Sequence, residues 1–101
     1  MYIMEGNLEA PKFNGKITEK YNVRYKLYFD ELLGDEKEVR KTIENKIKNL
    51  GLLMEKIPID SQKFLETLHI QLTAELGRFG IKLRNTEFEV LGKVEEPAVS
   101  Q

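Results

Sequence analysis

The sequence predicts an α+β fold, a two-layer sandwich in which two helices cover one face of an antiparallel sheet. Apolar residues alternate with polar ones along three segments, the period of two that half-buried strands require. Between the second and third segments, two stretches place apolar residues three or four apart, as amphipathic helices do. Because each helix has one apolar stripe and the sheet has one apolar face, the helices must pack on that face. We expect the order strand, strand, helix, helix, strand in one domain over residues 1–95, with a flexible tail over residues 96–101.

The first two strands are expected over residues 2–10 and 16–30 and form a hairpin. Pro11 is expected to end the first strand, and Asn14-Gly15 is the residue pair that best tolerates the positive φ angles of a hairpin turn. In the second strand, odd and even positions form an apolar row and a basic row. The apolar row is Tyr21, Val23, Tyr25, Leu27 and Phe29, and the basic row includes Lys16, Lys20, Arg24 and Lys26.

The first helix is expected to begin after Asp35, a good N-cap residue that has Glu38 three positions later, as in a capping box. Gly51 stands where a C′ glycine would end it. Between them lies one apolar stripe at spacings of four, four and three, formed by Val39, Ile43, Ile47 and Leu50.

The second helix is expected to follow Asp60 or Ser61, either of which can act as its N-cap. If Asp60 is the cap, Ile59 and Phe64 occupy the two positions of a hydrophobic staple. Gly80 is expected to stop the helix. The predicted apolar stripe is Leu65, Leu68, Leu72, Leu76 and Phe79.

The third strand is expected within residues 81–95, where the alternation changes phase. A phase change near Asn85 indicates either a β-bulge or a loop up to Arg84 with the strand beginning after it. The sequence leaves open whether residues 92–99 form a fourth strand. The apolar residues are first odd-numbered and then even-numbered: Ile81, Leu83, Phe88, Val90 and Val94.

Charges on the polar faces predict the order of the strands. The first strand carries Glu5 and Glu9 and the third carries Glu87 and Glu89, whereas the second is basic. Opposite charges stabilise neighbouring strands and like charges do the reverse, so the basic strand should lie between the acidic ones. The first and third strands are then edges with unpaired backbone groups, which favours self-association.

Composition bounds the function classes. The chain has 101 residues, 33% of them charged, a net charge of −1 and no Cys. The absence of Cys excludes disulfides, thiolate catalysis and zinc sites that need Cys, and the net charge makes no global case for binding a polyanion. Many Lys and Glu without Cys are also typical of heat-adapted proteins. With neither a basic, apolar leader nor a run of about 20 apolar residues, we expect a soluble cytoplasmic protein without a membrane partner.

Part of the chain resembles the tunnelling fold of 6-pyruvoyl-tetrahydropterin synthase relatives, over about two thirds of its length. The matching segments are Phe29-Asp30-Glu31-Leu32, Ile57-Pro58-Ile59-Asp60-Ser61 and Phe79-Gly80-Ile81-Lys82-Leu83. The resemblance implies assembly into barrels with the helices outside. It does not imply the family's zinc chemistry, because no histidine precedes His69 and the catalytic cysteine is absent. Glu87 or Glu89 lies near the position of the family's pterin-anchoring glutamate.

Two groups of side chains are candidate sites. Lys20, Arg24, Lys26 and Tyr28 could contact a nucleic acid through its phosphates and a stacked base, or simply pair with the acidic strands. Glu87, Glu89 and His69 could anchor a ligand. They could equally be a solvated strand face and a half-buried, hydrogen-bonded histidine. No catalytic residue, metal site or cofactor is assigned.

The leading functional hypothesis is a non-enzymatic assembly protein that forms a homo-oligomer through its sheet edges, as a structural or accessory subunit with an unknown protein partner. One alternative is a nucleic-acid-binding accessory protein that uses the basic face of the second strand. The other is a diverged tunnelling-fold enzyme or small-molecule binder. Exposed edges, a modest core and the lack of a catalytic constellation favour the first.

Overall fold

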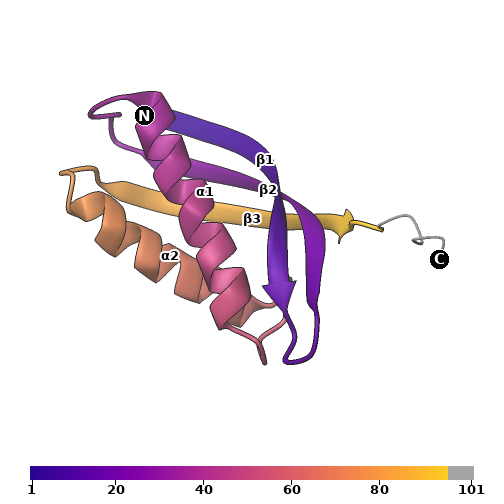
Figure 1. The fold of residues 1–101 in the computed structure, drawn as a ribbon. Coiled ribbons are helices and arrows are strands. Elements are labelled where there is room, and N and C mark those ends of the chain that lie inside the picture. The colour runs from indigo at the N-terminus through magenta and orange to yellow at the C-terminus, as the bar shows by residue number, and fades with distance from the viewer. Residues whose placement is uncertain (96–101) are drawn as a thin grey trace.

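The computed structural model describes residues 1–95 and confirms the predicted fold class, with two helices packed on one face of a three-stranded antiparallel sheet (Figure 1). The strand order is β1-β2-β3, as the charge pattern predicts. Helix α1 contacts β1 and helix α2 contacts β3. The tail predicted for residues 96–101 lies outside the described residues. The elements are β1 (Tyr2–Phe13), β2 (Thr18–Phe29), α1 (Glu36–Leu53), α2 (Gln62–Gly77) and β3 (Leu83–Lys93).

The β1–β2 hairpin is longer than the sequence predicts, because Pro11 does not end β1. Pro11 lies opposite Lys20 on an edge strand, where a missing N–H disturbs no ladder if it faces away from the partner. The predicted turn is confirmed. The Asn14 side-chain oxygen accepts hydrogen bonds from the backbone N–H groups of Lys16 and Ile17, at 2.9 and 3.0 Å. Gly15 has the expected positive φ of 98°.

Helix α1 begins where the sequence predicts and ends later. Asp35 is the N-cap, and its side chain accepts from the Lys37 N–H at 2.8 Å. Gly51 does not end the helix; it lies buried within it, where α1 crosses β1. A Cβ atom at Gly51 would lie 2.0 Å from the Pro11 carbonyl oxygen. The glycine therefore permits a close helix–strand approach rather than marking a stop.

The C-terminal end of α1 is closed by a lysine from β1. No basic residue occupies the last turn of the helix. The ammonium group of Lys12, on β1, instead donates to the Met54 carbonyl at 2.5 Å and to the carbonyl of Phe13, on β1, at 2.8 Å. A cation at this end complements the helix dipole. Lys12 is only 5% exposed, and burial lowers the pKa of its ammonium group.

Helix α2 is capped by Ser61, whose hydroxyl accepts from the Phe64 N–H at 3.2 Å. The predicted apolar stripe of this helix is wrong at both ends. Leu65 is only half-buried, and Phe79 lies beyond the helix and is 61% exposed. The buried row repeats every four residues instead, which keeps it on the side of α2 that faces the sheet: Phe64, Leu68, Leu72 and Leu76.

Of the two explanations that the sequence left open for the phase change near Asn85, a bulge or a loop, the structure has the bulge. Tyr28 pairs with Asn85 but Phe29 pairs with Leu83, so Arg84 is the extra residue. This shift returns Leu83 to the buried face of the sheet. A second irregularity, which the sequence did not indicate, falls near the end of the strand at Leu91.

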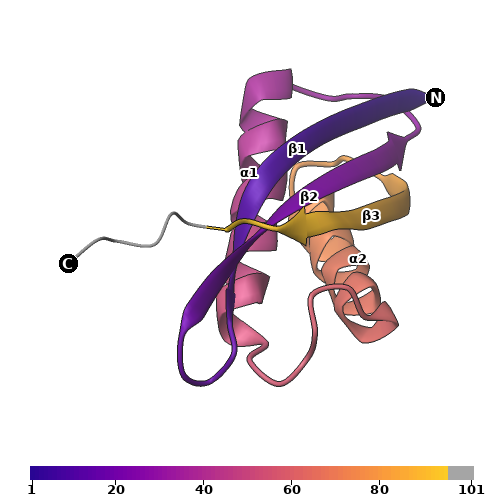
Figure 2. The ribbon, with the colours of Figure 1, turned by 90° about the vertical axis from the view of Figure 1, so that its right-hand side faces the viewer.

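The core lies between the sheet and the two helices, which cover the sheet side by side (Figure 2). Its largest side chains come from the apolar row of β2, from the helices and, with Met4, from β1. Tyr25, Phe29, Phe64, Ile43 and Leu72 are all fully buried. Among residues 1–95, no helix lies on the opposite face of the sheet.

Candidate interaction site at the sheet edge

The uncovered face of the sheet holds a ladder of opposite charges across its three strands. Arg24 contacts Glu89 at 2.5 Å, and Lys26 contacts Glu5 at 3.4 Å. The predicted pairing of the basic strand with both acidic strands is therefore present. A hollow of about 520 Å³ lies among these side chains.

The candidate nucleic-acid residues of β2 contact the candidate ligand-binding glutamates of β3, so the two predicted sites form one surface. The Tyr28 hydroxyl donates to Glu87 at 2.7 Å, and this carboxylate raises the pKa of the Tyr28 phenol. Lys20 lies farther along β2, opposite Pro11. Because carboxylates occupy both sides of the basic row, they would repel the phosphates that nucleic-acid binding requires.

His69 does not join Glu87 and Glu89. It extends from α2 on the covered side of the sheet, where its Nδ1 lies 2.8 Å from the Thr86 hydroxyl. The two glutamates project from the opposite face of β3. The three candidate ligand-anchoring residues therefore lie on two sides of the sheet. His69 adopts the half-buried, hydrogen-bonded arrangement that the sequence left as its alternative.

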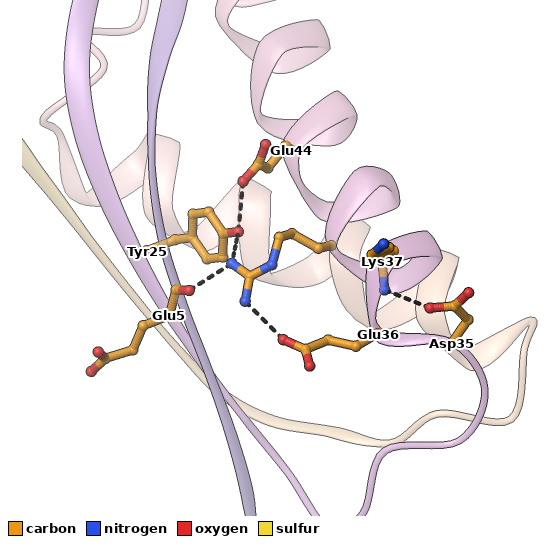
Figure 3. Close-up of polar contacts among 7 residues, drawn as sticks. Glu5, Tyr25, Asp35, Glu36, Lys37 and Glu44 are labelled. Carbon is orange, nitrogen blue, oxygen red and sulfur yellow. Dashed lines mark hydrogen bonds and ion pairs between the residues drawn. The ribbon is translucent and has the colours of Figure 1, made fainter.

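A polar cluster that the sequence did not reveal joins the sheet to α1 (Figure 3). The buried Tyr25 hydroxyl donates to Glu44 at 2.7 Å and accepts from Arg40 at 2.8 Å. Arg40 also donates to the Glu5 carbonyl at 2.6 Å and to Glu36 at 3.0 Å. Burial, followed by the Glu44 carboxylate, raises the pKa of Tyr25 well above its usual range.

A glycine makes room for this cluster. Gly6 lies opposite Tyr25 in the sheet, and a Cβ atom there would lie 2.2 Å from the tyrosine oxygen. The tyrosine ring therefore crosses β1 directly over Gly6 on its way to α1. A glycine inside the apolar row of the first strand was the one sequence signal that could have indicated such a crossing.

Replacing Tyr25 by Phe should destabilise the protein by about 1–3 kcal/mol, because its half-buried charged partners Arg40 and Glu44 would each lose a hydrogen bond. Tyr28→Phe is the matched control, since its hydroxyl lies at the exposed face, and it should cost less. Urea unfolding followed by circular dichroism measures both. Equal stability of Tyr25→Phe and the unaltered protein would show that the cluster contributes nothing to folding.

The direction of the backbone groups at each sheet edge follows from one hydrogen bond. The Val94 N–H donates to the Lys20 carbonyl at 2.8 Å, so even-numbered residues of β2 direct their backbone groups at β3 and odd-numbered residues direct theirs at β1. On β1 and β3, every second residue instead directs its backbone N–H and C=O away from β2, toward the open side of the strand. On β1 the outward groups belong to Ile3, Glu5, Asn7 and Glu9, and on β3 to Thr86, Phe88 and Val90.

Helix α1 partly closes the β1 edge. The outward carbonyl of Glu5, near the middle of this edge, accepts the hydrogen bond from Arg40. The Lys12 ammonium also bonds to the Phe13 carbonyl at the end of the strand. An added strand at this edge would have to displace the Arg40 guanidinium, which Tyr25 and Glu36 hold in place.

The β3 edge is open by comparison. Within residues 1–95, no hydrogen bond satisfies the outward backbone groups of Thr86, Phe88 and Val90. Beside this edge lies a groove of about 330 Å³ between β3 and the start of α2, and it is lined in part by Ile59 and Leu65. Phe88, Val90 and Leu65 are each only half-buried. The edge therefore combines free backbone groups with an incompletely covered apolar row.

Comparisons with known proteins assign no family to this chain. No family model, curated protein or solved structure matches it, and the resemblance to the tunnelling fold stays a prediction. Neither helix of residues 1–95 is long and apolar enough to cross a membrane. Across the same residues, no group of three or more His, Cys, Asp or Glu is placed to hold a metal ion.

Proposed function

We propose that this protein is a small non-enzymatic assembly protein, which forms a homo-oligomer through the edge of its sheet and acts as a structural or accessory subunit. The observation that carries the proposal is the open β3 edge. An unpaired strand edge is a template for another strand, and proteins that do not use such an edge usually block it. Here β1 is partly blocked by Arg40, whereas within residues 1–95 no hydrogen bond satisfies the outward backbone groups of Thr86, Phe88 and Val90 on β3.

The groove beside β3 supports the same role, because part of its lining is apolar. A strand added to this edge would direct alternate side chains to the covered side of the sheet. These side chains would lie against Phe88, Val90 and Leu65, which the chain itself leaves half-buried. Backbone hydrogen bonds would then supply affinity and the apolar contacts would supply specificity, as in other cases of strand addition.

Native mass spectrometry over a range of concentrations tests the proposal, with two matched variants. Val90→Pro removes an outward N–H of β3 and leaves the ladder to β2 intact, so it should abolish the oligomer. Ile3→Pro makes the same change at the β1 edge and should leave the oligomer unchanged. A monomer at every concentration would overturn the proposal, as would an oligomer that survives Val90→Pro.

A further inference from the structure

We propose that a separate pocket, between the start of α1 and the end of α2, binds a small molecule that carries an aromatic ring and a protonated amine. The pocket has a volume of about 310 Å³, at the lower end of the range for small-molecule sites. Figure 1 shows the loop before α1 and the loop after α2 at the same end of the molecule. The pocket shares no residue with the groove beside β3, so this site goes beyond the proposed assembly function.

The floor of the pocket is built by the hydrogen-bonded turn that ends α2. The Ile81 N–H donates to the Leu76 carbonyl and the Gly80 N–H donates to the Gly77 carbonyl, both at 3.0 Å. Together with the positive φ of 78° at Gly80, these bonds form a Schellman motif, a helix ending that glycine favours. Leu76 and Ile81 line the pocket and are almost fully buried. The backbone therefore fixes an apolar floor before any ligand binds.

The walls of the pocket expose apolar side chains to solvent. Phe79 belongs to the same turn, where its N–H donates to the Leu76 carbonyl at 3.0 Å, and it is 61% exposed. Leu33, from the loop before α1, is also exposed. It lies across the turn, since a Cβ atom at Gly80 would lie 3.9 Å from the Leu33 side chain. A ligand ring placed here would remove apolar surface from water and stack against an aromatic side chain.

Two carboxylates at the start of α1 give the pocket its charge. Asp35 and Glu38 both line it. Within residues 1–95, no ion pair joins either of them to a cation, whereas Glu36 pairs with Arg40 at 3.0 Å. The helix N-terminus carries roughly half a positive charge, which offsets only part of the two negative charges. The pocket therefore favours a cation and disfavours an anion.

Size and charge together select the class of ligand. A pocket of this volume accommodates one ring with a short chain, and it is too small for a whole helix of a partner protein. An aromatic alkylamine meets both requirements. Its ring would lie against Phe79 and the apolar floor, and its ammonium group would donate to the carboxylates of Asp35 and Glu38. Such charge-assisted hydrogen bonds are stronger than those between neutral groups.

A nuclear magnetic resonance titration with three matched probes tests the site. Phenethylamine has an alkylammonium group that is protonated at neutral pH, as the lysine side chain is. Phenethyl alcohol carries a hydroxyl in its place, and hydrocinnamate carries a carboxylate. Phenethylamine should shift the backbone amide signals of Gly34, Thr42 and Ile81 in a saturable manner. It should bind about five-fold more tightly than the alcohol, the magnitude of one exposed ion pair, and hydrocinnamate should bind most weakly.

Three variants assign the binding to this pocket. Glu38→Gln should weaken phenethylamine binding about five-fold and leave binding of phenethyl alcohol unchanged. Phe79→Ala should weaken the binding of both probes, because it removes the exposed ring. Glu66→Gln is the matched control. It makes the same change of charge at an exposed position of α2 outside the pocket, and it should alter neither affinity.

Each contrary result overturns a stated part of the inference. Equal affinities for the amine and the alcohol would overturn the cationic class of ligand. The absence of a saturable shift at the pocket with any probe would overturn the site itself. Binding that survives both Glu38→Gln and Phe79→Ala unchanged would place the probes elsewhere and would also overturn the site. None of these results affects the proposed function, which the native mass and Val90→Pro test separately.

Discussion

Replacing Leu72 by Asp is expected to unfold the protein. Leu72 is fully buried in the row of α2 that faces the sheet. Losing its packing alone costs about 2–5 kcal/mol, and a carboxylate without a partner in that place adds a large desolvation cost. A domain of this size has a total stability of about 5–15 kcal/mol. Circular dichroism should show loss of the cooperative thermal transition.

Ile70→Asp is the control for this prediction. Ile70 lies two residues away on the same helix but is 67% exposed, so its substitution should change stability by no more than about 0.5 kcal/mol. The comparison separates the effect of burying a charge from the intrinsic helix propensity of Asp. A cooperatively folded Leu72→Asp variant would mean that α2 packs on the sheet through another face.

Replacing Gly51 by Ala should destabilise the protein, against the usual effect of this change. In an exposed helix interior, Ala is favoured over Gly by about 1 kcal/mol. At Gly51 a methyl group would lie 2.0 Å from the backbone oxygen of Pro11, and a backbone atom cannot move aside as a flexible side chain can. Over-packing of this kind costs about 1–3 kcal/mol or more. Urea unfolding should therefore show a net loss of stability.

Gly77→Ala is the matched control. Gly77 is the last residue of α2, its φ is not positive, and no atom lies within 4 Å of the place its Cβ would take. The same substitution should there stabilise the protein, by up to about 1 kcal/mol. If Gly51→Ala is instead the more stable variant, α1 does not approach β1 as closely as described.

Short-range patterns were sufficient for the elements and for their order. Alternation along residues 16–30 predicted β2, and the spacing of Val39, Ile43 and Ile47 predicted the buried side of α1. The phase change near Asn85 indicated a bulge or a loop, and the structure has the bulge. These signals are local, because the periods of strands and helices are set by the backbone itself. The charges on the polar faces added the strand order, because Arg24 and Lys26 need partners on both sides.

The candidate site could be predicted only in part. Sequence reasoning found the charged rows of β2 and β3, and it found two exposed edges. It could not find that Arg40 reaches the Glu5 carbonyl, because the two residues are far apart along the chain and Arg40 has many possible partners on a charged helix. It therefore could not separate a partly closed edge from an open one.

By itself the sequence determined the helices, the strands, their order and the polarity of each sheet face, because periodicity and charge are properties of neighbouring residues. Only the tertiary structure decided the role of Gly51, the burial of Lys12 and the partners of Tyr25. Each of these depends on how closely α1 approaches the β1–β2 hairpin. That distance is set by the packing of the whole core, and the same packing leaves β3 as the open edge.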